Sequence, residues 1–172
     1  MTAGITIRPA NAGDIPAIAA IYGPYVENTA VSFEFDAPSV EEMAKRWHDL
    51  TSNDFPYLVA ERDDQVIGFA YAGPFRARPA YEHTVENSIY LVPDHCRRGV
   101  GSQLMTSLVV ACKEKGYRFM IAGISDDGAE ASVPFHEKLG FKLIGRFDGI
   151  GLKKGKAVGI SFMQLALIPK AG

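Results

Sequence analysis

The sequence has few cysteines and no long hydrophobic run. Its 172 residues include two cysteines, Cys96 and Cys112, which are too few for a disulfide framework and lack the spacing of a metal site. No apolar run reaches the roughly 18 residues of a membrane-spanning helix. The N-terminal residues lack a basic stretch followed by an apolar core, so no secretory signal is expected. These absences predict a cytoplasmic protein without a metal or a membrane partner.

An excess of basic residues is also missing. Lys and Arg number 18 against 20 Asp and Glu, for a formal net charge of −2. Proteins that bind nucleic acids usually carry a clear positive excess, so no nucleic-acid partner is predicted. The chain shows no repeat and no low-complexity segment, and its length suits one domain over residues 1–172.

Hydrophobic periodicity predicts alternating strands and helices. Pro24 is expected to bend or end the first helix, and Ser39 with Glu42 forms a capping box for the second. A polar turn at Asp63 and Asp64 predicts a hairpin. Strands are expected over 5–10, 31–35, 57–73 (the hairpin), 83–92, 119–124, 141–147 and 157–167, and helices over 14–28, 39–50, 101–115 and 130–139. This order predicts an α/β fold, in which a central sheet carries helices on both faces.

The stretch CRRGVGSQL joins a predicted strand to a predicted helix. Helix N-termini have free N–H groups and a partial positive charge, and glycines let the backbone approach a ligand closely. Arg97 and Arg98 would add charge-assisted hydrogen bonds. Together with Gly99 and Gly101 they indicate a phosphate site, although a solvated basic turn explains the same spacing.

That stretch resembles the coenzyme A pyrophosphate loop of the GNAT superfamily of N-acetyltransferases, whose pattern is Q/R-x-x-G-x-G/A. HEKLGF at 136–141 is similar to the late helix-to-strand signature of the same superfamily. GPFRARPAYEHTVENSIYL at 73–91 and VENTAVSFEF at 26–35 resemble the phosphinothricin and methionine sulfoximine acetyltransferases. The similarity covers nearly the whole chain. It implies a mixed, mostly antiparallel, twisted sheet of about seven strands, and a homodimer.

The resemblance also implies acetyl-CoA as co-substrate and assigns residues to it. The strand residues Ile89, Tyr90, Leu91 and Val92 would offer backbone groups to the pantetheine arm. The pyrophosphate would lie on the loop and helix start, formed by Arg97, Arg98, Gly99, Val100, Gly101 and Ser102.

Acetyl transfer to an amine needs a base for the amine and a donor for the leaving thiolate. Glu86 lies where the family places a carboxylate near the amine, and a half-buried carboxylate with a raised pKa suits that task. A solvent-facing strand residue is the alternative. His136 lies where the family places the proton donor, and a packed or capping histidine is its alternative. Tyr90 is a further candidate donor.

For the acceptor, the resemblance implies a small amino acid with a tetrahedral, oxygen-bearing side-chain group. Arg76 and Arg78 are candidates to bind its oxygens, and the resemblance implies that Lys153 approaches the acceptor from the last loop of this subunit or of a dimer partner. Phe33, Phe75 and Tyr81 are candidate pocket walls, and Asn28 and Thr29 are weaker ones. Each aromatic has core packing as its alternative.

Several positions depart from the family pattern. Cys96 stands at the Q/R position of the loop, Ala129 stands where an asparagine often contacts the coenzyme, and the last loop has Ala157 and Gly159 in place of Trp and Asp. Two other functions therefore stay open. One is acetyl transfer to a different amine, such as a polyamine, an aminoglycoside or a protein N-terminus. The other is a non-catalytic acyl-CoA sensor.

Overall fold

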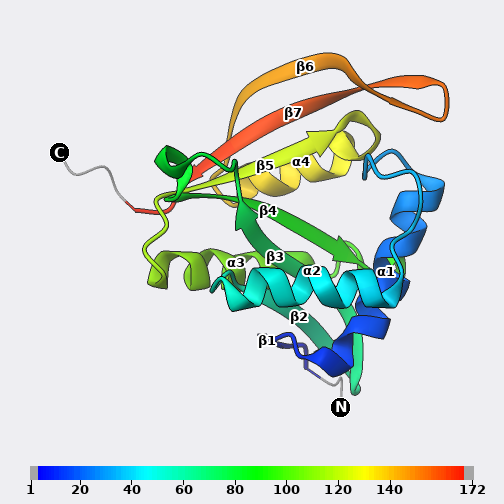
Figure 1. Cartoon of the computed structure of the whole chain (residues 1–172), viewed down its shortest axis with the longest axis vertical. Coiled ribbons are helices and arrows are strands. Elements are labelled where there is room, and N and C mark those ends of the chain that lie inside the picture. The colour runs from blue at the N-terminus through cyan, green and yellow to red at the C-terminus, as the bar shows by residue number, and fades with distance from the viewer. Residues whose placement is uncertain (1–3, 169–172) are drawn as a thin grey trace.

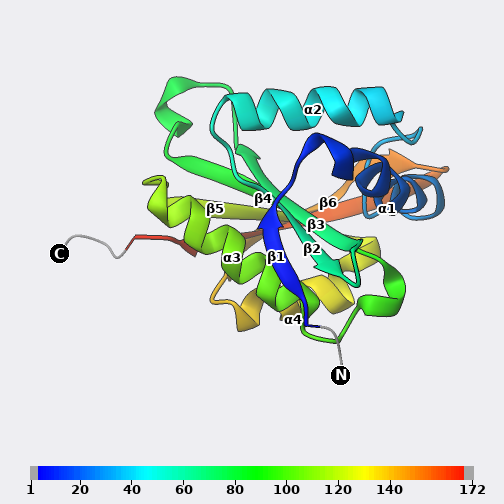
Figure 2. The same cartoon turned by 90° about the horizontal axis from the view of Figure 1, so that it is seen from below.

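The computed structural model describes residues 4–168 as one seven-stranded sheet with helices on both faces (Figures 1 and 2). The strand order is β1-β2-β3-β4-β5-β7-β6, and every pair is antiparallel except β4 with β5. The strands are β1 Thr6–Pro9, β2 Tyr57–Arg62, β3 Gln65–Pro74, β4 Thr84–Leu91, β5 Phe119–Ser125, β6 Lys142–Lys153 and β7 Lys156–Ala166. The predicted mixed, mostly antiparallel sheet is confirmed.

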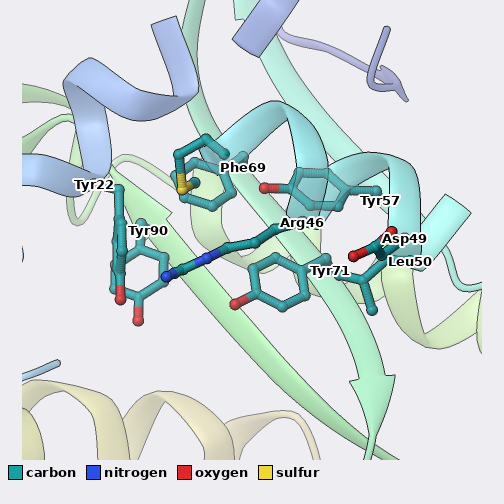
Figure 3. A pocket seen from close by; sticks show the side chains of 9 residues that line it. Tyr22, Arg46, Asp49, Leu50, Tyr57, Phe69, Tyr71 and Tyr90 are labelled. Atoms are coloured by element: carbon teal, nitrogen blue, oxygen red, sulfur yellow. The ribbon is translucent and has the colours of Figure 1, made fainter. Parts of the chain in front are cut away.

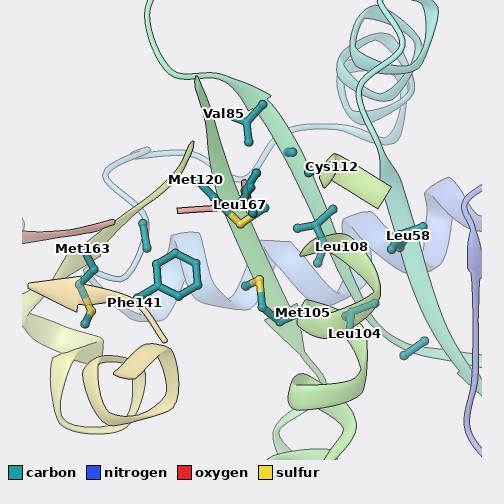
Figure 4. Close-up of a cluster of buried hydrophobic side chains, with 14 of the residues drawn as sticks. Leu58, Val85, Leu104, Met105, Leu108, Cys112, Met120, Phe141, Met163 and Leu167 are labelled. Carbon is teal, nitrogen blue, oxygen red and sulfur yellow. The ribbon is translucent and has the colours of Figure 1, made fainter. Parts of the chain in front are cut away.

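Two helices cover each face of the sheet. Figure 2 shows α1 Ile15–Asn28 and α2 Val40–Ser52 on one side, and α3 Val100–Glu114 and α4 Ala129–Lys138 on the other. Each face has its own apolar core. One contains Ile18, Val26, Val59 and Phe69 under α1 and α2. The other is built on α3, with Leu104, Leu108, Met120 and Phe141 among its members (Figure 4). Short 3₁₀ turns lie at Ala12–Asp14, Pro79–Tyr81, Pro93–His95 and Asp126–Gly128.

Local signals placed most boundaries correctly. Asp63 and Asp64 both have positive φ, 51° and 59°, as a two-residue hairpin turn requires. The Ser39 side chain accepts a hydrogen bond from the Glu42 N–H (3.2 Å) and caps α2. In a full capping box the Glu42 carboxylate would also accept a hydrogen bond from the Ser39 backbone N–H. Here that carboxylate accepts from the Arg46 side chain instead (2.9 Å).

Of two predictions near the N-terminus, one is confirmed and one is wrong. α1 runs through Pro24 to Asn28, in agreement with the predicted range 14–28. Val26, beyond the proline, is fully buried in the core, and that burial offsets the lost backbone hydrogen bond. The segment 31–35 is a loop, not a strand. Its Ser32 is buried against the Tyr22 hydroxyl (Oγ to Oη 2.8 Å), so the alternation reflects a loop attached to α1.

The end of the chain also differs from the prediction. The expected glycine- and lysine-rich loop is mostly strand, because β6 extends to Lys153 and β7 begins at Lys156. Only Lys154 and Gly155 form the turn, with φ of 52° and 74°. This long β6–β7 hairpin lies at one edge of the sheet (Figure 1). In residues 4–168 no helix is long and apolar enough to cross a membrane.

Candidate active site

β4 and β5 part in the middle of the sheet. Their parallel pairing runs from Thr84 opposite Phe119 to Glu86 opposite Ile121 and goes no further. β4 keeps β3 as its partner up to Leu91, while β5 continues to Ser125 paired with β7. The edge of β4 that faces β5 is therefore open beyond Glu86, and an extended ligand can hydrogen-bond there as a strand would.

The predicted contact residues 89–92 differ in their availability at this edge. The Val92 N–H donates to the Ile67 carbonyl (2.9 Å), and its own carbonyl accepts from the His95 N–H (2.9 Å). The Leu91 carbonyl accepts from the Tyr25 hydroxyl (2.7 Å). Backbone groups alternate between the two edges of a strand. Val92 is bonded to β3, so Tyr90, two residues earlier and opposite Phe69, also directs its backbone groups to β3. Ile89 directs its backbone groups to the opening and fits the predicted role better than Tyr90 or Val92.

The predicted phosphate loop leads directly from β4 into α3. Gly99 is the N-cap residue of α3, with φ of 81° and open space around it. Arg97 has φ of 61°, and both it and Arg98 are exposed. No side chain caps α3, so the N–H groups of its first residues, Val100, Gly101 and Ser102, are left for a ligand, and the exposed Arg97 and Arg98 directly precede them in the chain. A diphosphate fits this arrangement.

Glu86 lies where β4 and β5 begin to part. It is half-buried, and its Oε1 is 3.1 Å from the position that a Cβ on Gly123 of β5 would occupy. Any side chain at 123 would contact this carboxylate, so the glycine leaves it room. Burial raises the pKa of Glu86, and the nearby Arg76 charge opposes that shift. The alternative of a solvent-facing strand residue does not fit this environment.

The loop after β3 gathers three of the predicted acceptor residues. The Arg76 guanidinium lies 5.1 Å from the centre of the Phe75 ring, and the Tyr81 ring meets Phe75 edge-on at 5.6 Å. Arg76 is close enough to influence Glu86. Arg78 is exposed and directly precedes the 3₁₀ turn, and its backbone carbonyl accepts a hydrogen bond from the Tyr81 N–H.

Phe33 and Lys153 lie in a different group. The Lys153 ammonium is buried and donates to the carbonyls of Val26 (2.7 Å) and Ser32 (2.6 Å). Phe33 covers Gly151 of β6, where a Cβ would come within 2.6 Å of its ring. Lys153 also borders a cavity of about 390 Å³ together with Asn28 and Thr29. Sequence position alone could not separate this group from the Arg76 loop.

His136 on α4 is buried. Its Nδ1 lies 2.8 Å from the Ser132 carbonyl oxygen, which can only accept, so Nδ1 carries the hydrogen. Nε2 then accepts from the Asn87 side-chain nitrogen at 3.3 Å. Burial lowers the pKa of His136, which favours this neutral form. Asn87, on β4 beside the opening, has a buried Oδ1 without a hydrogen-bond partner in the described residues.

The sequence comparisons decide the family. A profile described as "Acetyltransferase (GNAT) domain" matches residues 7–158. The chain belongs to the GNAT acetyltransferases. The predicted family and the predicted class, an acetyl-CoA-dependent N-acetyltransferase, are thereby confirmed.

Relatives of this acetyltransferase align over nearly its whole length. It is 38% identical over 162 residues to phosphinothricin N-acetyltransferase of Alcaligenes faecalis, covering 94% of this chain and 82% of that one. It is 34% identical over 166 residues to the L-methionine sulfoximine/L-methionine sulfone acetyltransferase of Pseudomonas paraeruginosa, covering 95% of both. A solved phosphinothricin acetyltransferase of Sinorhizobium meliloti, in complex with acetyl-CoA, superposes with a TM-score of 0.90 at 42% identity over 96% of this chain and 89% of that one.

Sequence reasoning missed several residues around Glu86 in this acetyltransferase. Gly73 and Gly123 flank it on the neighbouring strands, and Asn87 follows it. A second cavity is bordered by aromatic residues of β2, β3 and β4, which include Tyr57, Tyr71 and Tyr90. The sequence feature that could have indicated this cavity is the presence of tyrosines at inward-facing positions of the predicted strands. In residues 4–168 no group of three or more His, Cys, Asp or Glu side chains could hold a metal ion.

Proposed function

We propose that this acetyltransferase moves the acetyl group of acetyl-CoA to the α-amine of a small amino acid or amino-acid analogue, with Glu86 as the general base. One observation carries the proposal: a half-buried carboxylate with a raised pKa lies where β4 and β5 part. A thioester held in that opening would bring its carbonyl carbon next to an amine beside Glu86.

The reaction requires a neutral amine. Glu86 takes a proton from the ammonium form, directly or through an ordered water, and the nitrogen then attacks the thioester carbonyl carbon. The C–S bond breaks as the amide C–N bond forms, the proton held by Glu86 passes to the thiolate sulfur, and the second proton of the nitrogen is lost to solvent. Burial raises the pKa of Glu86 toward neutral pH. The protonated carboxyl can therefore form during the reaction and give its proton to the thiolate.

The coenzyme would use the open strand edge and the start of α3. The backbone N–H and carbonyl of Ile89 and the N–H of Leu91 would hold the pantetheine arm. The N–H groups of Val100, Gly101 and Ser102, with Arg97 and Arg98, would hold the diphosphate. Cys96, in place of the family's Q/R, is exposed, and the backbone donors do not depend on its side chain.

His136 acts in this proposal through Asn87. Its protonated nitrogen is bonded to Ser132, so Nε2 has no hydrogen to give a thiolate in the neutral form. It instead orients the Asn87 amide, whose unpartnered Oδ1 can accept a hydrogen bond from a ligand N–H in the opening. The proton-donor role expected from the family would need the opposite tautomer.

The acceptor is proposed to resemble those named for the relatives, phosphinothricin and methionine sulfoximine or sulfone. Arg76 lies close enough to Glu86 to influence its carboxylate. An acceptor whose α-amine meets Glu86 can therefore place its own α-carboxylate on the Arg76 guanidinium. A polycationic acceptor is disfavoured by this arginine. A non-catalytic sensor would not need a buried base opposite glycine.

The homodimer is proposed to form through β6. Leu143, Ile144, Phe147, Ile150 and Leu152 on this strand are all more than half exposed, and an apolar face of this extent is typical of a protein interface. Sedimentation of the wild-type protein and of Phe147→Asp should show a dimer that the variant weakens. A wild-type monomer at micromolar concentration would refute this part. We place the enzyme in the cytoplasm.

The function is tested by thiol release from acetyl-CoA with a panel of amines. The panel contains phosphinothricin, methionine sulfoximine, methionine sulfone, ordinary amino acids and a polyamine. Glu86→Gln should lower kcat/KM by about 10²–10⁴-fold and keep coenzyme affinity, measured by calorimetry. A sensor would bind acetyl-CoA and acetylate nothing, and a polyamine acetyltransferase would acetylate only the polyamine.

A further inference from the structure

A cavity of about 290 Å³ lies between α2 and the sheet, on the face that carries Glu86 (Figure 3). Ligand pockets span about 300–1,000 Å³, so this volume lies at their lower end and has room for an amino-acid side chain. Its walls are mostly ring faces and aliphatic carbon. The lining residues are Tyr22, Met43, Arg46, Asp49, Leu50, Tyr57, Phe69, Tyr71 and Tyr90.

The cavity reaches the proposed base through Leu50 and Gly73. Gly73 lies directly opposite Glu86 in the β3–β4 register, and facing side chains in such a pair are about 5 Å apart. A Cβ on Gly73 would lie 3.3 Å from Leu50 Cδ2, and Leu50 lines the cavity. Because Gly73 has no side chain, nothing at this position separates Glu86 from the cavity.

The charges around the cavity disfavour an anion. Arg46 is the one cationic residue among the described residues that line the cavity. Its guanidinium is bound to both oxygens of Glu34 (2.8 and 3.0 Å) and to Glu42 (2.9 Å). Asp49 adds a further carboxylate at the wall. One positive charge therefore faces three negative ones, and an incoming anion would meet no unpaired cation there.

Neutral hydrogen-bonding groups are present instead. Tyr57, Tyr71 and Tyr90 line the cavity, and burial raises the pKa of each, so they stay uncharged phenols. The Tyr22 hydroxyl is already bonded to Ser32 (2.8 Å) and Glu34 (2.6 Å). Phenols can donate to an uncharged oxygen without the desolvation cost of burying a second ion.

We propose that this cavity receives the side chain of the acceptor and selects uncharged side chains over anionic ones. The inference rests on the proposed transfer to an α-amine beside Glu86. Methionine sulfone and glutamine are then preferred to phosphinothricin and glutamate, whose side chains end in a phosphinate and a carboxylate.

Two matched pairs of acceptors test the selection by kcat/KM at saturating acetyl-CoA. Glutamine against glutamate changes only an amide to a carboxylate, and methionine sulfone against phosphinothricin compares a neutral with a charged tetrahedral group. A preference of tenfold or more for the neutral member of both pairs is expected. A smaller preference in either pair overturns the proposal.

Gly73→Val tests the route. Its side chain would stand between Leu50 and Glu86, so kcat/KM for glutamine should fall at least tenfold more than kcat/KM for glycine, which needs no cavity. Gly4→Val is the control, because nothing lies within 4 Å of a Cβ at Gly4, before β1. Equal losses for both acceptors in Gly73→Val would overturn the route.

Binding separates this inference from the proposed function. Trp47, the one tryptophan of the chain, packs against the core that borders the cavity, so its fluorescence reports occupancy. If no amine is acetylated, the proposed function fails. Tighter binding of methionine sulfone than of phosphinothricin, weakened by Gly73→Val, would still support the cavity assignment, and equal binding or no binding would refute it.

Discussion

The ammonium of Lys153 closes the C-terminal end of α1. The last carbonyls of a helix lack partners within the helix and carry a partial negative charge. Here three successive ones have partners from elsewhere: Tyr25 accepts from the Thr29 hydroxyl (2.5 Å), Val26 from Lys153 (2.7 Å) and Glu27 from Lys154. Lys153 also reaches the Ser32 carbonyl at 2.6 Å. We therefore expect Lys153→Met to loosen α1 from the β6–β7 hairpin.

The size of the effect follows from burial. Hydrogen bonds from a charged group contribute about 1.5–3 kcal/mol each, so the two made by Lys153 contribute about 3–6 kcal/mol before the cost of burying the ammonium. Methionine removes that cost, which is several kcal/mol for a buried ion. A net loss of about 2 kcal/mol is expected, equal to about 4–8 °C in Tm for a chain of this length.

Lys154→Met is the matched control. Its ammonium caps the neighbouring carbonyl but is exposed, so its loss should cost less than about 1 kcal/mol. Urea unfolding at pH 7 measures both variants. If Lys153→Met is no less stable than Lys154→Met, the capping argument is refuted. A tenfold rise in the acceptor KM of Lys153→Met, well below its Tm, would instead support the direct acceptor contact predicted from the sequence.

Three further changes test the site and the fold. Glu86→Gln should lower kcat/KM by about 10²–10⁴-fold and abolish the acidic limb of the pH profile. In the wild type this limb should lie above the ordinary glutamate range, because burial raises the pKa of Glu86. An unchanged limb in the variant would contradict the role of Glu86 as base. Asn87→Ala should weaken acetyl-CoA binding about tenfold, measured by calorimetry, because one hydrogen bond to the coenzyme is lost. ¹⁵N NMR should find His136 protonated at Nδ1. Protonation at Nε2 would contradict the role of His136 in orienting Asn87. Asp14→Asn should cost about 1–3 kcal/mol at pH 7. Hydrogen bonds from Arg8 lower the pKa of Asp14 in the folded state. The extra stability of the wild type over Asp14→Asn is therefore complete above the unfolded-state pKa of Asp14 and disappears as pH falls through its folded-state pKa. A stability difference independent of pH would contradict the ion pair.

The local parts of the fold were predictable because they depend on nearby residues. The capped start of α2 at Ser39, the turn at Asp63 and Asp64, and the glycine ends of α3 and α4 are all set by residues a few positions apart. The segment 31–35 failed for the opposite reason. Its partners are Tyr22 on α1, Arg46 on α2 and Lys153 at the end of β6, and periodicity carries no information about contacts that distant.

The candidate site divides along the same line. The Arg97–Ser102 segment was identifiable because the loop and helix start are contiguous. The cavity beside Glu86 was not, since its tyrosines come from α1, β2, β3 and β4 and meet only when the sheet forms. His136 shows a third case. The family pattern placed it at the site, but only the carbonyl of Ser132 and the amide of Asn87 indicate which of its nitrogens carries the hydrogen.

Gly159, where the family pattern has aspartate, has a steric cause in this fold. A Cβ there would lie 2.7 Å from an Arg146 nitrogen and 2.8 Å from both an Asp126 oxygen and the Phe147 backbone carbonyl. The Gly159 N–H instead donates to Asp126 (2.8 Å), which is paired with Arg146. Asp126, from the end of β5, thus supplies a carboxylate where residue 159 would have placed one. The same Asp126 lines the cavity of about 390 Å³ beside Lys153, so in this chain the carboxylate next to position 159 comes from Asp126.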